Sequence, residues 1–399
     1  MPKASAAAWT LAGISLVTLA AAGPVQAAAL EQVVPNTIRL LYQEGRYIEF
    51  GVAYADPDQS GEGAVLPPFP PILPNGATLP GNTGDVFEGR WNISGAYKAD
   101  LNDRLSYALI FDEPLWADTR YGTGTFPVLP PPLPSSLYGG SMADLKTYQI
   151  SGVLAYDVTP SVKVFGGARA QLLEAKAAVS FVSNYSVDAE NKWGYGFLLG
   201  AAYERPDIAL RVALTYYSRI SYDLATAETL QAFGSPTPVV QDTTTSVDTP
   251  QSVQLDFQTG VAPKTLVFGF IRWVDWSEFA IDPPVYEQAT AALLGEGRPL
   301  VDYADDWWTY NLGVGRQLTD ALAGSFSITY EPDVGGTMTS LGPYDGRTTA
   351  AAALSYDYGQ WNFTGGLTYG VLGDTTNLLE TDFNDGSVWG AGLRVGYTF

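Results

Sequence analysis

Few side chains in this sequence have the chemistry that enzyme active sites require. The 399 residues include no His and no Cys, so a Ser or Thr nucleophile lacks its usual base and a zinc ion lacks its usual ligands. The carboxylate pairs Asp305-Asp306 and Glu331/Asp333 are the remaining candidates for acid–base work. Both pairs fall where a predicted strand meets a loop, and solvated acids are the ordinary occupants of such junctions. We therefore expect no enzyme activity, no cofactor and no metal.

Four arginines fall in the phase that we expect to face the interior of the fold: Arg169, Arg211, Arg219 and Arg394. Hydrogen bonds between Arg and a carboxylate are strong where water is excluded. These residues are therefore candidates for holding an acidic head group. For each of them, an ion pair with a neighbouring acid is the alternative explanation.

The elements that carry these residues are strands whose apolar and small or polar residues alternate. In the last one, Ser387–Phe399, the odd positions are mostly apolar with aromatics near both ends, and the even positions are mostly Gly, Arg or Thr. A soluble β-sandwich also alternates, but aromatics at both strand ends and a terminal Phe399 favour a lipid-facing strand. We count fourteen such segments, from about residue 46 to the C-terminus.

The connections between these segments alternate between short turns and long loops. Long connections are expected at about 56–89, 117–142, 182–191, 224–249, 280–305, 332–346 and 373–386. This alternation is typical of outer-membrane barrels, and in a membrane the sheet must close so that every backbone group is paired. The sequence thus predicts an all-β fold, a 14-stranded antiparallel transmembrane β-barrel over residues 46–399, in the outer membrane of a Gram-negative cell.

The N-terminus carries an export signal. Residues 1–27 have a weak basic start, a short apolar core and a small-x-small site at Val25-Gln26-Ala27, which predicts a cleaved signal peptide. Residues 28–45 then form a short periplasmic or lumenal segment before the first strand. The net charge of −21 argues against nucleic acid as a partner. It suits either cation binding in outer loops or simple solubility.

Pro114 is the most informative single residue because it falls inside the third predicted strand. Proline cannot donate to the hydrogen-bond ladder and is confined to edges, ends and bulges. A break at Phe111-Asp112-Glu113-Pro114 would kink the strand and open the wall; the alternative is that the strand ends at Glu113.

One segment of the sequence disfavours an open aqueous pore. The segment 265–274 is apolar on both faces, which indicates apolar cargo or a tightly packed plug in the lumen. Two loops contain proline-rich stretches, 66–74 and 126–134, that also carry Leu, Ile and Phe. These stretches favour stiff polyproline segments that either pack together as a lid or form an apolar landing surface for a ligand.

The chain resembles the FadL-type family of long-chain fatty acid transporters, which includes aromatic-hydrocarbon channels. Five stretches carry the resemblance: Tyr54-Ala55-Asp56-Pro57-Asp58, Pro114, Lys192–Phe197, Ala213–Arg219 and Val261–Phe279. The resemblance implies a fourteen-stranded barrel that an N-terminal hatch closes, with a lateral exit at a kink in the third strand, where Pro114 falls. It also implies a catch between outer loops, here including 182–191 and 224–249.

One departure from that family concerns the hatch. Family hatches run for some forty residues and carry an Asn-Pro-Ala near their end, whereas here the hatch is expected over 28–45 and reads Val34-Pro35-Asn36 at that place. A hatch this short puts gating by hatch movement in doubt. Lateral exit does not depend on it.

The leading hypothesis is passive uptake of long-chain fatty acids or similar hydrophobic molecules, with lateral release through the kink. An alternative is a porin-like channel that releases small aromatic or hydrophilic solutes directly into the periplasm. A third is an adhesive barrel whose acidic loops bind partners. For the barrel itself we expect contact with outer-membrane lipid and lipopolysaccharide, and a monomer.

Overall fold

The computed structural model describes residues 29–35, 37–66, 76–122, 136–231 and 235–399. The expected signal peptide, Asn36 of the expected hatch, and most of both proline-rich stretches lie outside the described residues.

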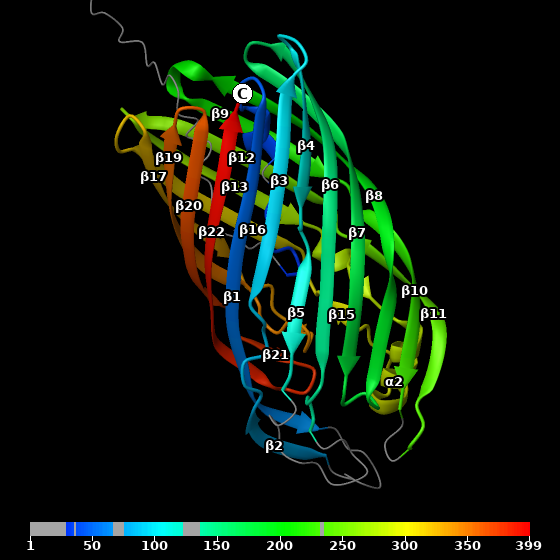
Figure 1. The fold of residues 1–399 in the computed structure, drawn as a ribbon. Helices are drawn as coiled ribbons and strands as arrows, with labels where there is room; N and C mark the ends of the chain where they lie inside the picture. The colour runs from blue at the N-terminus through cyan, green and yellow to red at the C-terminus, as the bar shows by residue number, and fades with distance from the viewer. Residues whose placement is uncertain (1–28, 36, 67–75, 123–135, 232–234) are drawn as a thin grey trace, which may run out of the picture.

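Within these residues, fourteen antiparallel strands form a closed barrel (Figure 1), as the sequence predicted. The first strand, β1 (Tyr47–Leu66), pairs with the second, β3 (Arg90–Asp100), and with the last, β22 (Asp382–Thr398), which closes the wall. Three strands are each built from two pieces: the third from β4 and β5, the seventh from β9 and β10, and the eighth from β11 and β12. The remaining wall is, in order, β4 (Leu105–Asp112) with β5 (Trp116–Arg120), β6 (Met142–Thr159), β7 (Val162–Val179), β8 (Tyr185–Arg205), β9 (Leu210–Tyr217) with β10 (Ile220–Leu230), β11 (Val239–Thr249) with β12 (Ser252–Ala262), β13 (Thr265–Val274), β16 (Trp307–Gln317), β17 (Leu322–Glu331), β19 (Arg347–Tyr358) and β20 (Trp361–Leu372).

The two faces of the wall differ in chemistry. In β22, Trp389 and Leu393 point outward and are 46% and 64% exposed. Arg394 points inward, and its neighbours on that face are Gly392 and Gly396. Large apolar side chains are exposed in the same way around the barrel. Because the closed sheet satisfies its own backbone hydrogen bonds, such an apolar outer surface suits hydrocarbon surroundings.

The two ends of the barrel differ as well (Figure 1). At the short-turn end, which holds the start of β1 and the C-terminus, tight turns such as 101–104 and 318–321 join the strands. At the opposite, long-loop end lie the small elements β2 (Ala77–Asn82), η3 (Trp276–Glu278), β14 (Ala280–Ile281), α2 (Pro284–Leu294), β15 (Val301–Asp302), β18 (Thr337–Met338) and β21 (Thr375–Asn377); the turn η2 (Pro206–Ile208) lies at the short-turn end. No described helix has both the length and the apolar composition needed to cross a membrane.

Two expected long loops are wrong. The connection at 182–191 is only a turn between Val179 and Tyr185, and the one at 224–249 shrinks to 231–238, because strands extend into both regions. These extensions are rich in Thr, Ala and acidic residues, so they lack an apolar face that would mark them as strands. Inward hydroxyls bond across them instead, as Thr226 does with Thr243 at 2.7 Å.

The described part of the N-terminal segment, 29–45 without Asn36, lies inside the barrel. Its one-turn helix α1 (Thr37–Leu41) is buried throughout. Ile38, Leu40 and Leu41 pack against inward side chains of β4 and β6–β9, among them Phe165 and Tyr217. The segment therefore fills one side of the lumen near the short-turn end.

Candidate functional site

The third wall strand is interrupted at Pro114. β4 ends at Asp112, and the chain resumes as β5 at Trp116, with both pieces paired to β6. The strand thus continues beyond Glu113 instead of ending there. The missing N–H of proline explains why the ladder breaks at this position.

This interruption leaves a gap in the wall between the start of β3 and residues 112–116. Beyond the gap, β5 rejoins the chain before β3, since the Glu88 N–H donates to the Asp118 carbonyl at 3.1 Å and the Arg120 N–H to the Val86 carbonyl at 2.8 Å. The β3–β4 ladder runs only from Asp100↔Ser106 to Gly95↔Phe111, so residues 90–94 of β3 pair with β1 alone. Glu113 partly spans the gap, because its Oε2 accepts a hydrogen bond from the Ile93 N–H at 3.2 Å. Its carbonyl oxygen also accepts a bond from the Asn92 amide at 3.2 Å. A few side-chain contacts hold this part of the wall in place of a strand ladder.

The N-terminal segment is attached to the same break. The Gln32 N–H donates to the Pro114 carbonyl at 2.9 Å, and the Trp116 N–H donates to the Leu30 carbonyl at 3.0 Å. On the far side of the lumen, Glu31 forms a buried ion pair with Arg272 of β13, with Nε–Oε2 at 2.7 Å. The Glu31–Arg272 pair thus makes a crossing of the lumen, from the segment at the interrupted strand to β13.

Beyond this crossing, toward the long-loop end, lies an apolar space that we call the loop-side pocket. It has a free volume of about 60 Å³. Side chains of β5–β8, β10 and β11 line it together with residues from the loops 281–303 and 339–342, with Leu30 at its base. An engineered cavity that binds benzene has about 150 Å³, so a cargo molecule fits only if loops or side chains move.

A second apolar space, the wall-side pocket, adjoins the first. It has a volume of about 40 Å³, and it shares Leu30, Ala117 and Tyr303 with the loop-side pocket. Phe87 and Trp116, which flank the wall gap, also line it. The two pockets together connect the loops with the gap through apolar side chains.

The loops contribute neutral tyrosines to these pockets, Tyr303 and Tyr344. Burial raises the pKa of Tyr303 well above its ordinary value, and burial raises the pKa of Tyr344 to about 12. Both phenols are therefore neutral at physiological pH and present an apolar ring with a hydrogen-bonding tip.

The helix α2 packs against β10 and β11 beside the loop-side pocket, and one carboxylate holds it in place. Glu228 of β10 is fully buried and accepts hydrogen bonds from the N–H groups of Val285 and Tyr286 at 3.0 and 3.1 Å. Tyr185 and Thr243 donate hydroxyl hydrogen bonds to the same carboxylate at 2.8 and 2.6 Å. A carboxylate at a helix N-terminus satisfies unpaired N–H groups and the helix dipole, so Glu228 fixes the loop 280–305 to the wall.

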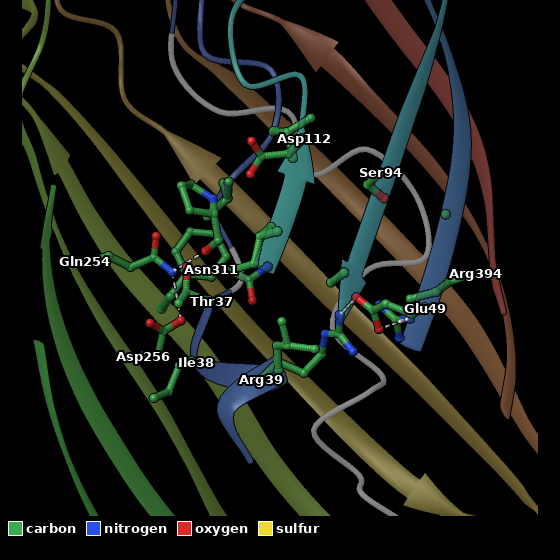
Figure 2. Close-up of a pocket in the computed structure, with 18 of the residues that line it drawn as sticks. Thr37, Ile38, Arg39, Glu49, Ser94, Asp112, Gln254, Asp256, Asn311 and Arg394 are labelled. Carbon is green, nitrogen blue, oxygen red and sulfur yellow. Dashed lines mark hydrogen bonds and ion pairs between the residues drawn. The ribbon is translucent and has the colours of Figure 1, made fainter. Parts of the chain in front are cut away.

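On the short-turn side of the crossing, the lumen holds a cavity of about 230 Å³. We call it the polar cavity because charged side chains lie among its apolar ones. Figure 2 shows Arg39, Glu49 and Arg394 together on one side of it and Gln254 with Asp256 on another. Arg39 pairs with Glu49, and Gln254 donates to Asp256 at 2.9 Å. The cavity lies beside the N-terminal segment, so that segment leaves part of the lumen unfilled.

The predicted exit residues divide between these spaces. Phe111 and Asp112 line the polar cavity, Glu113 spans the gap, and Pro114 bonds the N-terminal segment. Val34 and Pro35 of the expected hatch also line the polar cavity.

Three of the four arginines point into the lumen, and all three have partners. Arg169 donates to Gln149 at 2.9 Å, Arg211 stacks 3.4 Å from the Tyr42 ring centroid, and Arg394 lies 3.8 Å from Glu49. Arg211 and Arg394 line the polar cavity. None of the four lines either apolar pocket, where the described cations are instead Lys176 and Arg347.

The expected inward direction of Arg219 is wrong. Its side chain is 46% exposed and lies near Asp248 and Asp275. The break after Tyr217 shifts the strand alternation by one residue, so that Ser218 and Ile220 are buried and Arg219 points away from the lumen. A one-residue slip of this kind moves every following side chain to the other face.

Sequence reasoning missed the Glu31–Arg272 pair and Glu228. Arg272 is the only charge in the apolar run of β13, and that isolation was a usable signal for a buried partner. Glu31 lies 241 residues away, and no spacing rule connects them. Nor does any local pattern mark Glu228 as the residue that caps α2.

The chain is similar to known proteins over most of its length. Residues 2–361 match a family model described as outer membrane protein transport protein (OMPP1/FadL/TodX). No curated protein matches the chain.

Among solved structures, a Pseudomonas aeruginosa FadL homologue aligns with a TM-score of 0.72 at 14% identity, covering 90% of this chain and 91% of that one. The Pseudomonas putida toluene transporter TodX aligns with a TM-score of 0.63 at 12% identity, covering 93% and 95%. The Ralstonia pickettii toluene transporter TbuX aligns with a TM-score of 0.63 at 14% identity, covering 94% and 98%. At these identities the structures share the fold.

Proposed function

Because the chain belongs to the OMPP1/FadL/TodX family of outer membrane transport proteins, we propose that it takes up long-chain fatty acids or similar hydrophobic molecules passively and releases them sideways through the wall. The protein is an outer-membrane β-barrel. We assign its short-turn end to the periplasm and residues 1–27 to a cleaved signal peptide.

The observation that carries the proposal is the meeting of the wall gap with an apolar pocket. Trp116, on the far side of the Pro114 break, lines the wall-side pocket, and Leu30, Ala117 and Tyr303 join that pocket to the one under the loops. A hydrophobic molecule gains free energy along such a path, at roughly 25 cal/mol for each Å² of apolar surface removed from water. The next space toward the periplasm carries charged side chains among its apolar ones, which favours a sideways exit for apolar cargo.

In this proposal, Phe111, Asp112, Glu113 and Pro114 form the lateral exit, and 28–45 acts as a short hatch. The chemistry of the pockets favours cargo that is mainly hydrocarbon, because the described cations along the path, Lys176 and Arg347, are already engaged and not available for an acidic head group. Both have acidic partners, Asp144 and Glu331. Arg169, Arg211 and Arg394 then act after cargo leaves the pockets, or serve as structural pairs. Release requires no cofactor, and we propose that the barrel works as a monomer in contact with lipid and lipopolysaccharide.

The test is uptake of a labelled long-chain fatty acid, of toluene and of a small sugar by cells that lack their own transporter. The variant Pro114→Val restores the missing N–H and favours a continuous strand. We expect it to reduce hydrophobe uptake at least tenfold, with Pro263→Ala in a short turn as the matched control. Unchanged uptake by a folded Pro114→Val barrel would rule out lateral release.

The polar cavity supports a second candidate, direct release into the periplasm. It borders the N-terminal segment on the side that α1 leaves open, and its volume of about 230 Å³ holds several waters. A porin-like route predicts steady conductance in planar bilayers and sugar entry into cells. Sugar exclusion with hydrophobe entry would reject this candidate.

A further inference from the structure

The outward face of the barrel carries a furrow that the transport path does not use. It has a volume of about 790 Å³ and crosses β16, β17, β19, β20, β22 and β1 to Trp91 of β3. Its floor consists of small residues, and larger side chains stand beside them. The floor is formed by Gly324, Ala352, Gly365 and Ala391, and the rims by Phe326, Leu354, Leu367 and Leu393.

Strand register explains why these residues form one continuous feature. Two neighbouring rows of paired residues run across the wall, one from Val314 to Trp91 and the other from Arg316 to Ile93. From β17 to β22, large and small side chains alternate from strand to strand within each row, and the second row is offset from the first. Each small residue therefore lies beside a large one, which produces a winding groove instead of separate pits.

The furrow climbs from the periplasmic edge to the middle of the membrane. Arg316 is one residue from the short-turn end of β16, whereas Ile93 is seven residues from the short-turn end of β3. At about 3.3 Å per residue and a strand tilt of about 40°, the rise is roughly 15 Å. That rise is half of a hydrocarbon core of about 30 Å, which is the depth of one leaflet.

One cation lies at the periplasmic end of the furrow. Arg316 lines the furrow and points outward, and within the described residues its guanidinium makes no ion pair or hydrogen bond. The other outward arginine at this end of a strand, Arg205 on β8, is paired with Asp207 at 2.7 Å. In a chain with a net charge of −21, an unpaired arginine at the depth of lipid head groups is complementary to a phosphate.

We propose that the furrow is a binding site for one anionic phospholipid of the periplasmic leaflet, with its phosphate on Arg316 and an acyl chain along Gly324, Ala352, Gly365 and Ala391. The end of that chain lies near Trp91, beside the gap in the wall. The inference rests on the outer surface alone and does not depend on the route that cargo takes.

The first experiment counts retained lipid by native mass spectrometry of the full barrel, after detergent exchange in the presence of phosphatidylglycerol or phosphatidylcholine. We expect one phosphatidylglycerol per chain and at least tenfold less retention by Arg316→Gln and by Ala352→Phe/Ala391→Phe. The matched controls, Arg205→Gln and the outward Ala201→Phe on β8, retain it. Equal retention by all variants overturns the site. Loss in Arg316→Gln alone also overturns it, since attraction to a charge without the furrow explains that result.

A second experiment does not depend on bulky substitutions. Because the protein has no Cys, Ala391→Cys and Ala201→Cys each introduce a single thiol. Both thiols point outward, on the strands β22 and β8, which lie far apart around the barrel. A phosphatidylglycerol with a thiol-reactive group at its chain end should label position 391 at least tenfold faster than position 201, and Arg316→Gln should remove the difference. Equal labelling rates, or a disulfide-linked dimer through position 391 in place of lipid labelling, would contradict lipid binding; the dimer would identify a second copy as the occupant.

Discussion

The two halves of the lumen differ in the side chains that line them, although the same strands build both. Toward the long loops, inward positions of β6–β8, β10 and β11 carry Ala, Leu, Val and Thr and enclose apolar space. Toward the short turns, the polar cavity is lined in part by Arg39, Glu49, Asp256 and Arg394. The N-terminal segment lies between the halves. Leu30 and Gln32 bond it to the Pro114 break, and Glu31 between them pairs with Arg272 across the lumen.

This difference indicates what each half can do with a hydrophobic molecule. The apolar half accepts it once the loops move, whereas the polar half would have to give up hydrated or paired charges to admit it. The boundary coincides with the wall gap. A barrel with this arrangement favours sideways release of hydrophobes without needing the lumen to be sealed against water.

The largest expected effect comes from the boundary between the halves. Arg272→Met leaves Glu31 as a buried unpaired charge, which typically costs about 3–5 kcal/mol. We expect a drop of that size in the free energy of unfolding measured by urea titration, together with conductance in planar bilayers as the segment loosens. Arg205→Met, which removes a solvent-exposed pair, should change neither measurement. The double variant Arg272→Met/Glu31→Gln should recover much of the loss, and no recovery would argue against the pairing.

The next effect concerns the cover of the apolar half. Glu228→Gln weakens the charge-assisted bonds to Val285 and Tyr286, each worth about 1.5–3 kcal/mol. Limited proteolysis should then cut the loop 280–305 roughly tenfold faster, since 1.4 kcal/mol corresponds to a factor of ten. Asp223→Asn, in an exposed bond to Ser246 on the same strand pair, is the control. Unchanged cleavage would mean that other contacts hold α2.

A third variant separates the two apolar pockets from each other. Ala117 lines both, so Ala117→Trp should block their junction and lower uptake of toluene or fatty acid about tenfold, while leaving sugar exclusion intact. Ala201→Trp, on the outward face of β8, adds the same bulk where it meets no cargo. Normal uptake by a folded Ala117→Trp barrel would show that cargo bypasses this junction.

The smallest effect is expected outside both halves. Arg219 pairs with Asp248 at 3.4 Å on an exposed surface, and such pairs contribute at most about 1 kcal/mol. Arg219→Gln should leave uptake and stability nearly unchanged. A loss of uptake comparable to that of Ala117→Trp would restore this residue as a candidate for binding a head group.

The sequence predicted the barrel well because alternation and turn lengths are local properties. The strand count, the position of the break at Pro114 and the inward phase of Arg169, Arg211 and Arg394 all follow from spacing along single strands. The prediction failed where geometry depends on distant partners. Strand extensions near 185–191 and 224–249 are stabilised by cross-strand hydroxyls, and the phase slip after Tyr217 reversed Arg219.

The lumenal site was less predictable for the same physical reason. Glu31 and Arg272 are far apart in sequence, and the apolar pockets draw their lining from many strands and three loops. Alternation along a strand predicts which side chains point inward, but not how far each lies along the barrel axis. The pockets form only when strand register brings inward residues of different strands to the same height. A short N-terminal segment was correctly predicted, but its attachment to the break was not.

That attachment has a thermodynamic consequence. Gln32 and Leu30 bond backbone groups on both sides of the break, so a wall that opens and a segment that shifts share part of one equilibrium. Linkage is reciprocal: whatever binds better to the open wall must loosen the segment by the same free energy. Cargo bound at the gap should therefore increase the rate of hydrogen exchange in residues 29–35, although the cargo itself has not entered the periplasmic half of the lumen.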